Sequence, residues 1–131
     1  MHYALLLHSR EPAPGEIEPE AITEMQHAFQ AYLAALDAAG VLRAAEILTS
    51  QAMSTTLTRR TGELQVQDGP FAETKEALAG VFVVEVADLD AAIGWAEKCP
   101  AASYGTLEIR PVATWGDGPE WKTPDPAPAQ P

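Results

Sequence analysis

Four ionisable side chains are expected to gather on one face of a β-sheet. His8 ends a short apolar strand, Glu85 lies in a long apolar strand, and Glu108 and Arg110 alternate along the last strand. Because successive side chains of a strand point to opposite faces, all four fall opposite the wholly apolar positions. Charges on an otherwise apolar face need partners, so the pattern predicts a network of Glu108, Arg110 and Glu85.

Two interpretations of this polar set are open. In the first, it is a salt-bridge network that fixes the register of a dimer, as buried ion pairs often do. In the second, it is a substrate site. Arg110 would bind a substrate carboxylate, His8 would move a proton, and Glu108 would be a further substrate-binding residue.

The segment Asp68-Gly69-Pro70-Phe71-Ala72-Glu73-Thr74-Lys75-Glu76 is the second candidate for chemistry. Its first half is a turn, because Asp and Gly tolerate special backbone angles and Pro fixes its own φ. Asp68 either closes this turn or acts as a general base. Glu73 and Lys75 either belong to a solvated strand entry or contribute to substrate binding. Stiff turns with ionisable groups often border binding sites.

Composition excludes several classes of function. The chain has 131 residues, the size of one domain, and a formal net charge of −11, which disfavours nucleic acid and anionic membranes as partners. Cys99 is the only cysteine, so no internal disulfide forms. His2 and His8 lie about 20 Å apart along a strand, and no HExxH or Gly-rich phosphate motif occurs, so neither a metal nor a cofactor is expected. With no signal-like start and no long apolar run, a cytoplasmic protein is expected.

The elements that must position these residues follow from hydrophobic periodicity. Apolar steps of three and four residues predict a helix from Pro19 to Gly40, with a stripe that begins at Ile22 and Met25. A second helix begins at the N-cap Asp88 and is closed by Pro100. The expected strands are 3–8, 41–48, 55–60, 63–67, 78–87 and 106–115.

This order predicts an α+β fold, a ferredoxin-like sandwich with an inserted β-hairpin. Residues 1–115 form the domain, and the Pro-rich residues 116–131 form a disordered tail. The helices cover one face of the sheet. The simplest cover for the other face is a second copy, so a homodimer is expected.

Several segments resemble the DGPF branch of the YCII-related protein family, in the same order along the chain. The segments are Asp68–Glu76, Ala79–Phe82, Asp88–Ala92, Trp95–Ala96, Cys99–Pro100 and Glu108–Val112. The resemblance implies a ferredoxin-like fold that dimerises into an α+β barrel with a cleft on each protomer. Other YCII proteins often carry a His and an Asp near the first helix. Here His27 and Asp37 do not match that spacing, so the pair is not carried over.

Two functions therefore remain. The first is a cofactor-independent lyase or isomerase for a small molecule, with Asp68 and His8 as acid/base groups. The second is a non-catalytic ligand-sensing or interaction module. This reading follows from the resemblance, because the genes of DGPF-family proteins are often found beside genes of extracytoplasmic-function sigma factors.

Overall fold

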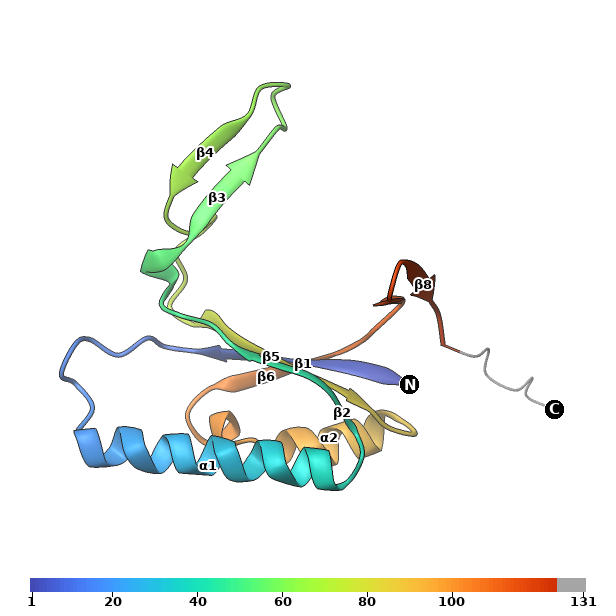
Figure 1. Ribbon diagram of the computed structural model, residues 1–131. Helices are drawn as coiled ribbons and strands as arrows, with labels where there is room; N and C mark the ends of the chain where they lie inside the picture. The colour runs from blue at the N-terminus through green and yellow to red at the C-terminus, as the bar shows by residue number, and fades with distance from the viewer. Residues whose placement is uncertain (125–131) are drawn as a thin grey trace.

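A four-stranded antiparallel sheet carries two helices on one of its faces (Figure 1). The computed structural model describes residues 1–124, and the strand order is β2-β5-β1-β6. This mixed α+β architecture is compatible with a ferredoxin-like fold. No helix of the described part is long and apolar enough to cross a bilayer. The elements of this layer pair are β1 (His2–Ser9), α1 (Pro19–Ala38), β2 (Leu42–Ile47), β5 (Ala77–Glu85), α2 (Leu89–Glu97) and β6 (Thr106–Pro111), with short 3₁₀ turns η1 (Gln51–Met53) and η2 (Pro100–Ser103).

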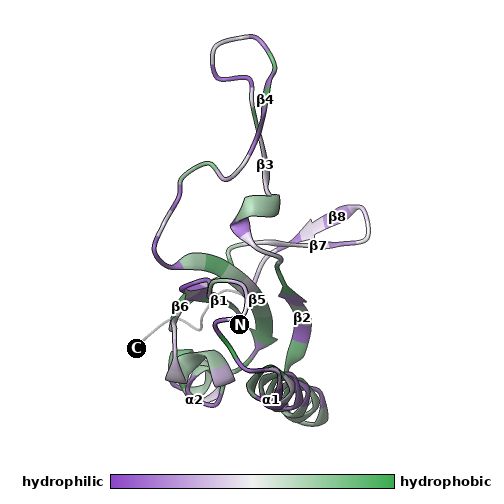
Figure 2. Cartoon of the chain, turned by 90° about the vertical axis from the view of Figure 1, so that its left-hand side faces the viewer, coloured by the Kyte–Doolittle hydropathy of each residue, from purple (hydrophilic) through white to green (hydrophobic). Residues whose placement is uncertain are grey.

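The hydrophobic core lies between the sheet and the helices. Strand alternation places Tyr3, Leu5 and Leu7 of β1 in this layer, as expected from the sequence. The neighbouring β5 is hydrophobic along most of its length (Figure 2) and directs Phe82 and Val84 to the same side. The opposite face of the sheet carries no helix (Figure 1), so it remains open in the single protomer.

Local chemistry explains the helix boundaries. Pro19 is the first residue of α1, where its missing N–H costs no hydrogen bond. Gly40 follows the helix with φ +71°, a left-handed value that favours glycine, and its N–H donates to Asp37 O at 2.9 Å. Asp88 caps α2, because its Oδ1 accepts from Ala91 N at 2.9 Å.

The first turns of α1 differ from expectation. The predicted apolar stripe begins at Ile22 and Met25, but Ile22 is 46% and Met25 is 36% exposed. The packed part of the stripe begins at Phe29 and continues through Tyr32 to Leu36. The N-terminal half of α1 therefore presents apolar side chains that the protomer itself does not cover.

Between β2 and β5, the chain forms an antiparallel pair, β3 (Thr55–Thr58) and β4 (Gln65–Asp68). We call residues 55–68 the arm. The arm rises from the sheet on the side away from the helices (Figure 1). Gly62 at its tip has φ +94°, which an L side chain would adopt only with strain.

The C-terminal part departs from expectation. The last strand of the sheet ends at Pro111 instead of Trp115. Trp115–Asp117 (β7) and Glu120–Lys122 (β8) then form a small hairpin, so residues 116–122 are not the featureless start of a tail. Gly118 allows its turn with φ +61°. The rest of the expected tail, from residue 125, lies outside the described residues, and the division at residue 115 stays a prediction.

A core truncation tests the layer arrangement. Leu5 lies in a central strand and is fully buried, so Leu5→Ala should lower the free energy of unfolding by about 2–5 kcal/mol. Ile93→Ala on the exposed side of α2 is the matched control and should change it by less than about 0.5 kcal/mol. Equal losses in denaturant unfolding would contradict the burial of β1.

Candidate functional site

A histidine, a carboxylate and an arginine meet on the open face of the sheet. His8 Nε2 lies 3.5 Å from Glu108 Oε1, and Arg110 Nη2 donates to Glu108 Oε2 at 2.9 Å. The Arg110 hydrogen bond, and then its charge, hold the pKa of Glu108 below its ordinary value. Three of the four predicted polar residues are thus brought together. Arg110 is 67% exposed, so its guanidinium is not buried in the single protomer.

The fourth residue belongs to a second group, which corrects the expected network. Glu85 faces His2 across the β1–β5 ladder, and His2 Nε2 lies 3.4 Å from Glu85 Oε2. Arg43 Nε donates to the same oxygen at 2.7 Å and lowers the pKa of Glu85. Glu108 lies on β6, on the other side of β1, where it is opposite Leu6. β1 therefore separates the two carboxylates. Arg43 sits where the β2–β5 register shifts, a bulge that alternation cannot predict.

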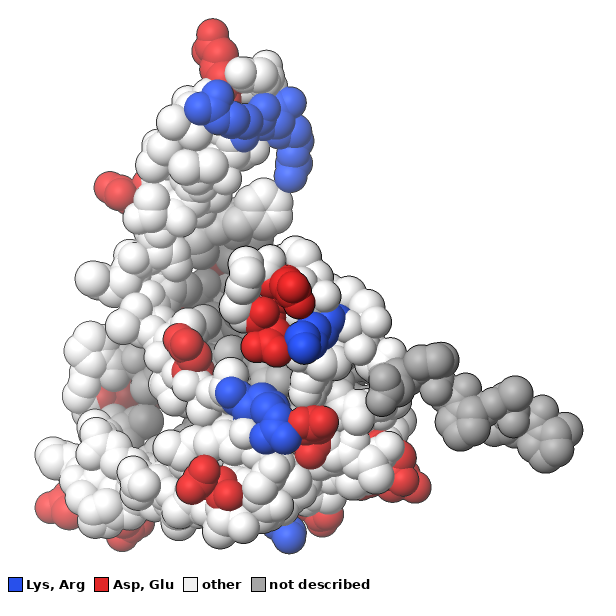
Figure 3. All heavy atoms as spheres, turned by 45° about the vertical axis from the view of Figure 1, so that its right-hand side comes forward, with Lys and Arg blue, Asp and Glu red and all other residues white. Residues whose placement is uncertain are grey.

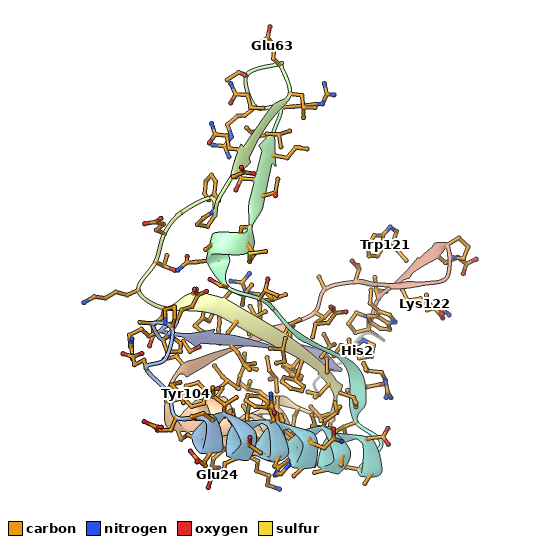
Figure 4. All side chains as sticks on the ribbon, turned by 60° about the vertical axis from the view of Figure 1, so that its left-hand side comes forward. His2, Glu24, Glu63, Tyr104, Trp121 and Lys122 are labelled. Carbon is orange, nitrogen blue, oxygen red and sulfur yellow. The ribbon has the colours of Figure 1, made fainter. Side chains whose placement is uncertain are left out.

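The two histidines differ in access. His2 is only 7% exposed because Trp115 of β7 packs edge-on against its ring, with centroids 3.9 Å apart. Its buried Nδ1 has no hydrogen-bond partner within the described residues. Figure 4 shows His2 on the side of the molecule where β7 and β8 rise. His8 is partly accessible to solvent, with its side chain 31% exposed.

His8 borders a cleft of about 670 Å³ between the end of β1 and the arm base. Glu76 and the predicted turn residues Pro70 and Phe71 line the same cleft. The remaining lining is mixed: it includes apolar side chains such as Leu48, Met53 and Leu78 and the hydroxyl side chains of Ser50, Ser54, Thr55, Thr56 and Thr74. His8 therefore shares this cleft with residues of the Asp68–Glu76 segment, and the roles predicted for the site residues stay predictions.

Asp68 does not belong to that cleft lining. It ends β4 with an exposed side chain, and the turn after it is closed by the backbone, where Gly69 N donates to Ser54 O at 2.7 Å. Gly69 has φ +104°. No hydrogen bond from the Asp68 side chain occurs within residues 1–124. The pairing of Asp68 with His8 thus has no geometric support here.

Glu73 and Lys75 border a neighbouring hollow of about 520 Å³ together with Glu11. Glu11 fixes the wall of this hollow, because its Oε1 accepts from Gln51 N at 2.7 Å and its Oε2 from Ser50 Oγ at 2.8 Å. Glu73 and Lys75, which were predicted to bind substrate, are both exposed. They lie apart from the Glu108–Arg110 pair, so the structure does not collect the predicted binding residues into one site.

A further cavity of about 500 Å³ opens on the helix side of the sheet and was not foreseen from the sequence. Its walls are mainly apolar and include Met25, Phe29, Phe82 and Tyr104. Partial burial raises the pKa of Tyr104. The apolar stripe of α1 could have indicated this cavity, because its first residues extend beyond the part of the helix that the sheet covers. Among the described residues, no cluster of His, Cys, Asp and Glu suits a metal ion.

Comparison with known proteins identifies the family. The profile of the YCII-related domain matches residues 1–116. The chain is also 33% identical over 120 residues to an uncharacterized protein of Rhizobium meliloti (strain 1021), covering 90% of this chain and 97% of that relative. The chain therefore belongs to the YCII-related family, which confirms the resemblance. The assignment to the DGPF branch stays a prediction.

The cover on His2 can be tested by truncation. Trp115→Ala should lower the free energy of unfolding by about 1–3 kcal/mol, because it exposes the packed His2 ring and removes the ring contact. Trp121→Ala, on β8 and 77% exposed, is the matched control and should have little effect. If both variants melt like the wild type, the β7–β8 hairpin does not pack on His2 in solution.

The Glu108 ion pair predicts a titration. The Glu108 carboxyl should titrate below its ordinary pKa of 4.5, and Arg110→Gln should move the midpoint upward. The pair favours the folded state above the unfolded-state pKa, and this contribution disappears as the pH falls through the lower folded-state pKa. Side-chain carboxyl NMR measures the midpoint. Arg10→Gln, which removes the partner of Glu16, should leave the Glu108 midpoint in place.

Proposed function

We propose that the protein is a cofactor-independent acid/base enzyme, a lyase or isomerase, whose substrate is a small molecule bound in the His8 cleft. The observation that carries this proposal is the relay from the cleft to the open face. His8 borders a cleft of about 670 Å³, Glu108 stands 3.5 Å behind it, and Arg110 holds Glu108. A carboxylate behind an imidazole is a recurring arrangement for proton transfer.

The relay determines which nitrogen of His8 does the chemistry. A carboxylate accepts hydrogen bonds and cannot donate them, so Glu108 favours the tautomer with the proton on Nε2. Nδ1 is then the basic nitrogen. It takes a proton from a carbon next to a carbonyl, which leaves an imidazolium and an enolate. In an α-hydroxyketone, the proton returns to the former carbonyl carbon while the hydroxyl proton moves to the former carbonyl oxygen, which completes an isomerisation. In a substrate with a leaving group on the β-carbon, the enolate expels that group, which completes an elimination.

The cleft favours a neutral substrate with apolar and hydroxyl groups. Its lining combines serine and threonine side chains with the apolar Leu48, Met53 and Phe71, and the chain carries a net charge of −11. Arg110 acts as a positioning residue for Glu108 in this proposal, since its guanidinium is already engaged with that carboxylate. Glu76 is the second titratable group of the lining and could serve as the partner acid or base.

We further propose that the protein belongs to the DGPF branch and works as a homodimer in an α+β barrel. The string Asp68–Glu76 supports the branch. The dimer is supported by the open sheet face, where Ala4, Leu6, Val81 and Val83 are half-buried without a helix above them.

The alternative is a ligand-sensing module without turnover. One observation favours it: Asp68, the expected second catalytic group, does not line the cleft. A cleft with one imidazole and many hydroxyls can bind a polar molecule without transforming it.

Hydrogen exchange separates these functions, because proton abstraction is the step shared by lyases and isomerases. The protein is incubated in D₂O with a panel of small neutral hydroxyketones, and exchange of the C–H next to the carbonyl is followed by NMR. Wild type should catalyse exchange for one member, and His8→Gln should lose at least 100-fold of the rate.

His27→Gln is the matched control, because His27 lies exposed on α1, away from the cleft lining. It should retain the wild-type rate, and circular dichroism should show both variants folded. Undiminished exchange in His8→Gln would overturn the assignment of His8. Saturable binding without exchange would favour the sensing module.

A further inference from the structure

We propose that the arm of each protomer clasps a second copy of the chain. The apolar side of the arm would cover the partner's helix-side cavity, and Arg59 and Arg60 at its tip would pair with the partner's Glu20 and Glu24. This inference rests on the homodimer proposed above and adds to it the contact that closes the dimer. It leaves the acid/base chemistry of His8 untouched.

The arm needs a cover that its own protomer does not supply. Leu57 and Val66 are direct cross-strand partners, yet they are 63% and 56% exposed. Leu64, close to the tip, is also exposed. A single two-stranded hairpin is marginally stable in water, so apolar pairs on it indicate a surface that becomes buried on association.

Two arginines near the arm tip indicate what kind of surface the arm contacts. The whole chain has eight Lys and Arg against nineteen Asp and Glu, and two of the eight, Arg59 and Arg60, are neighbours at the arm tip. Figure 3 shows Lys and Arg side chains near the end of the projection, with an acidic side chain beyond them. Glu63 follows the two arginines at the end of the hairpin, so the attraction is local to the Arg59–Arg60 pair and not to the arm as a whole. Two adjacent arginines are attracted to exposed carboxylates, which a second copy of this acidic chain offers in excess.

The arm is long enough to reach the helical layer of the partner. From Thr55 to Thr61 the chain spans roughly 20 Å at about 3.4 Å per residue. Two sheets that pack face to face lie about 10 Å apart, and a helix is about 10 Å thick. The tip therefore passes the partner's sheet and arrives at the partner's helical layer.

The helical layer offers a matching surface near the cavity. Met25, Ile47 and Tyr104 border the cavity and are exposed apolar side chains. Glu20 and Glu24 are exposed on the first turns of α1. Figure 4 shows Glu24 and Tyr104 at the end of the molecule from which the arm rises, with Glu63 at the arm's far end. Apolar and acidic groups thus lie side by side, as do the apolar and basic groups of the arm.

Charge reversal tests the contact in the full chain. Sedimentation velocity of the wild type at micromolar concentration should show a dimer. Arg59→Glu combined with Arg60→Glu should raise the dimer dissociation constant at least 10-fold. Adding Glu20→Arg and Glu24→Arg should recover most of this loss, because the rescue restores opposite charges across the interface.

The matched control is Lys75→Glu combined with Lys98→Glu, which produces the same change in net charge outside the arm. It should leave the dissociation constant within about twofold of wild type. A monomeric wild type would overturn the proposal together with the homodimer. A dimer that is insensitive to arm reversal would overturn the clasp alone, as would rescue by Asp37→Arg and Asp90→Arg at the other end of the helices.

Discussion

The two-residue alternation of β1 determines where the ionisable groups of this protein lie. Because Tyr3, Leu5 and Leu7 are committed to the helix side, His2 and His8 must emerge on the open face at opposite ends of the same strand. β1 also lies between β5 and β6, so each histidine meets a carboxylate from a different neighbour. A register shift of one residue would exchange the core and the polar face together.

The same three side-chain types then have two different environments. In both groups an arginine holds a glutamate, and the glutamate stands beside a histidine. Trp115 removes the first histidine from water, whereas the second borders a cleft. Ionised groups near the surface exchange protons and ligands readily, but a covered imidazole must displace its cover first. The two groups contain the same residue types and differ in how accessible the imidazole is to solvent and ligands. This accessibility is why the His8 group, and not the His2 group, is the functional candidate.

The sequence predicted the layers well and the contacts poorly. Periodicity and the end signals Pro19, Gly40 and Asp88 located both helices, because these signals act over a few residues. The polar face was also predicted, since alternation is a local rule. Which carboxylate pairs with which cation was not, because that depends on strand order and on the β2 bulge at Arg43. Trp115 was assigned to the last strand, since nothing local indicates that the chain leaves the sheet after Pro111.

The uncovered surfaces share one physical origin. A sheet with both helices on one face leaves its other face to water, and a helix that extends past the core leaves its first turns bare. The arm adds a third apolar surface, on a hairpin too thin to bury its own side chains. In the dimer proposed above, all three surfaces would be covered at once, because the open faces would pack together and each arm would pass beside the partner's sheet to the bare end of α1. The cleft of His8 lies at the arm base, so its shape and its exposure to water then depend on how the arm is held.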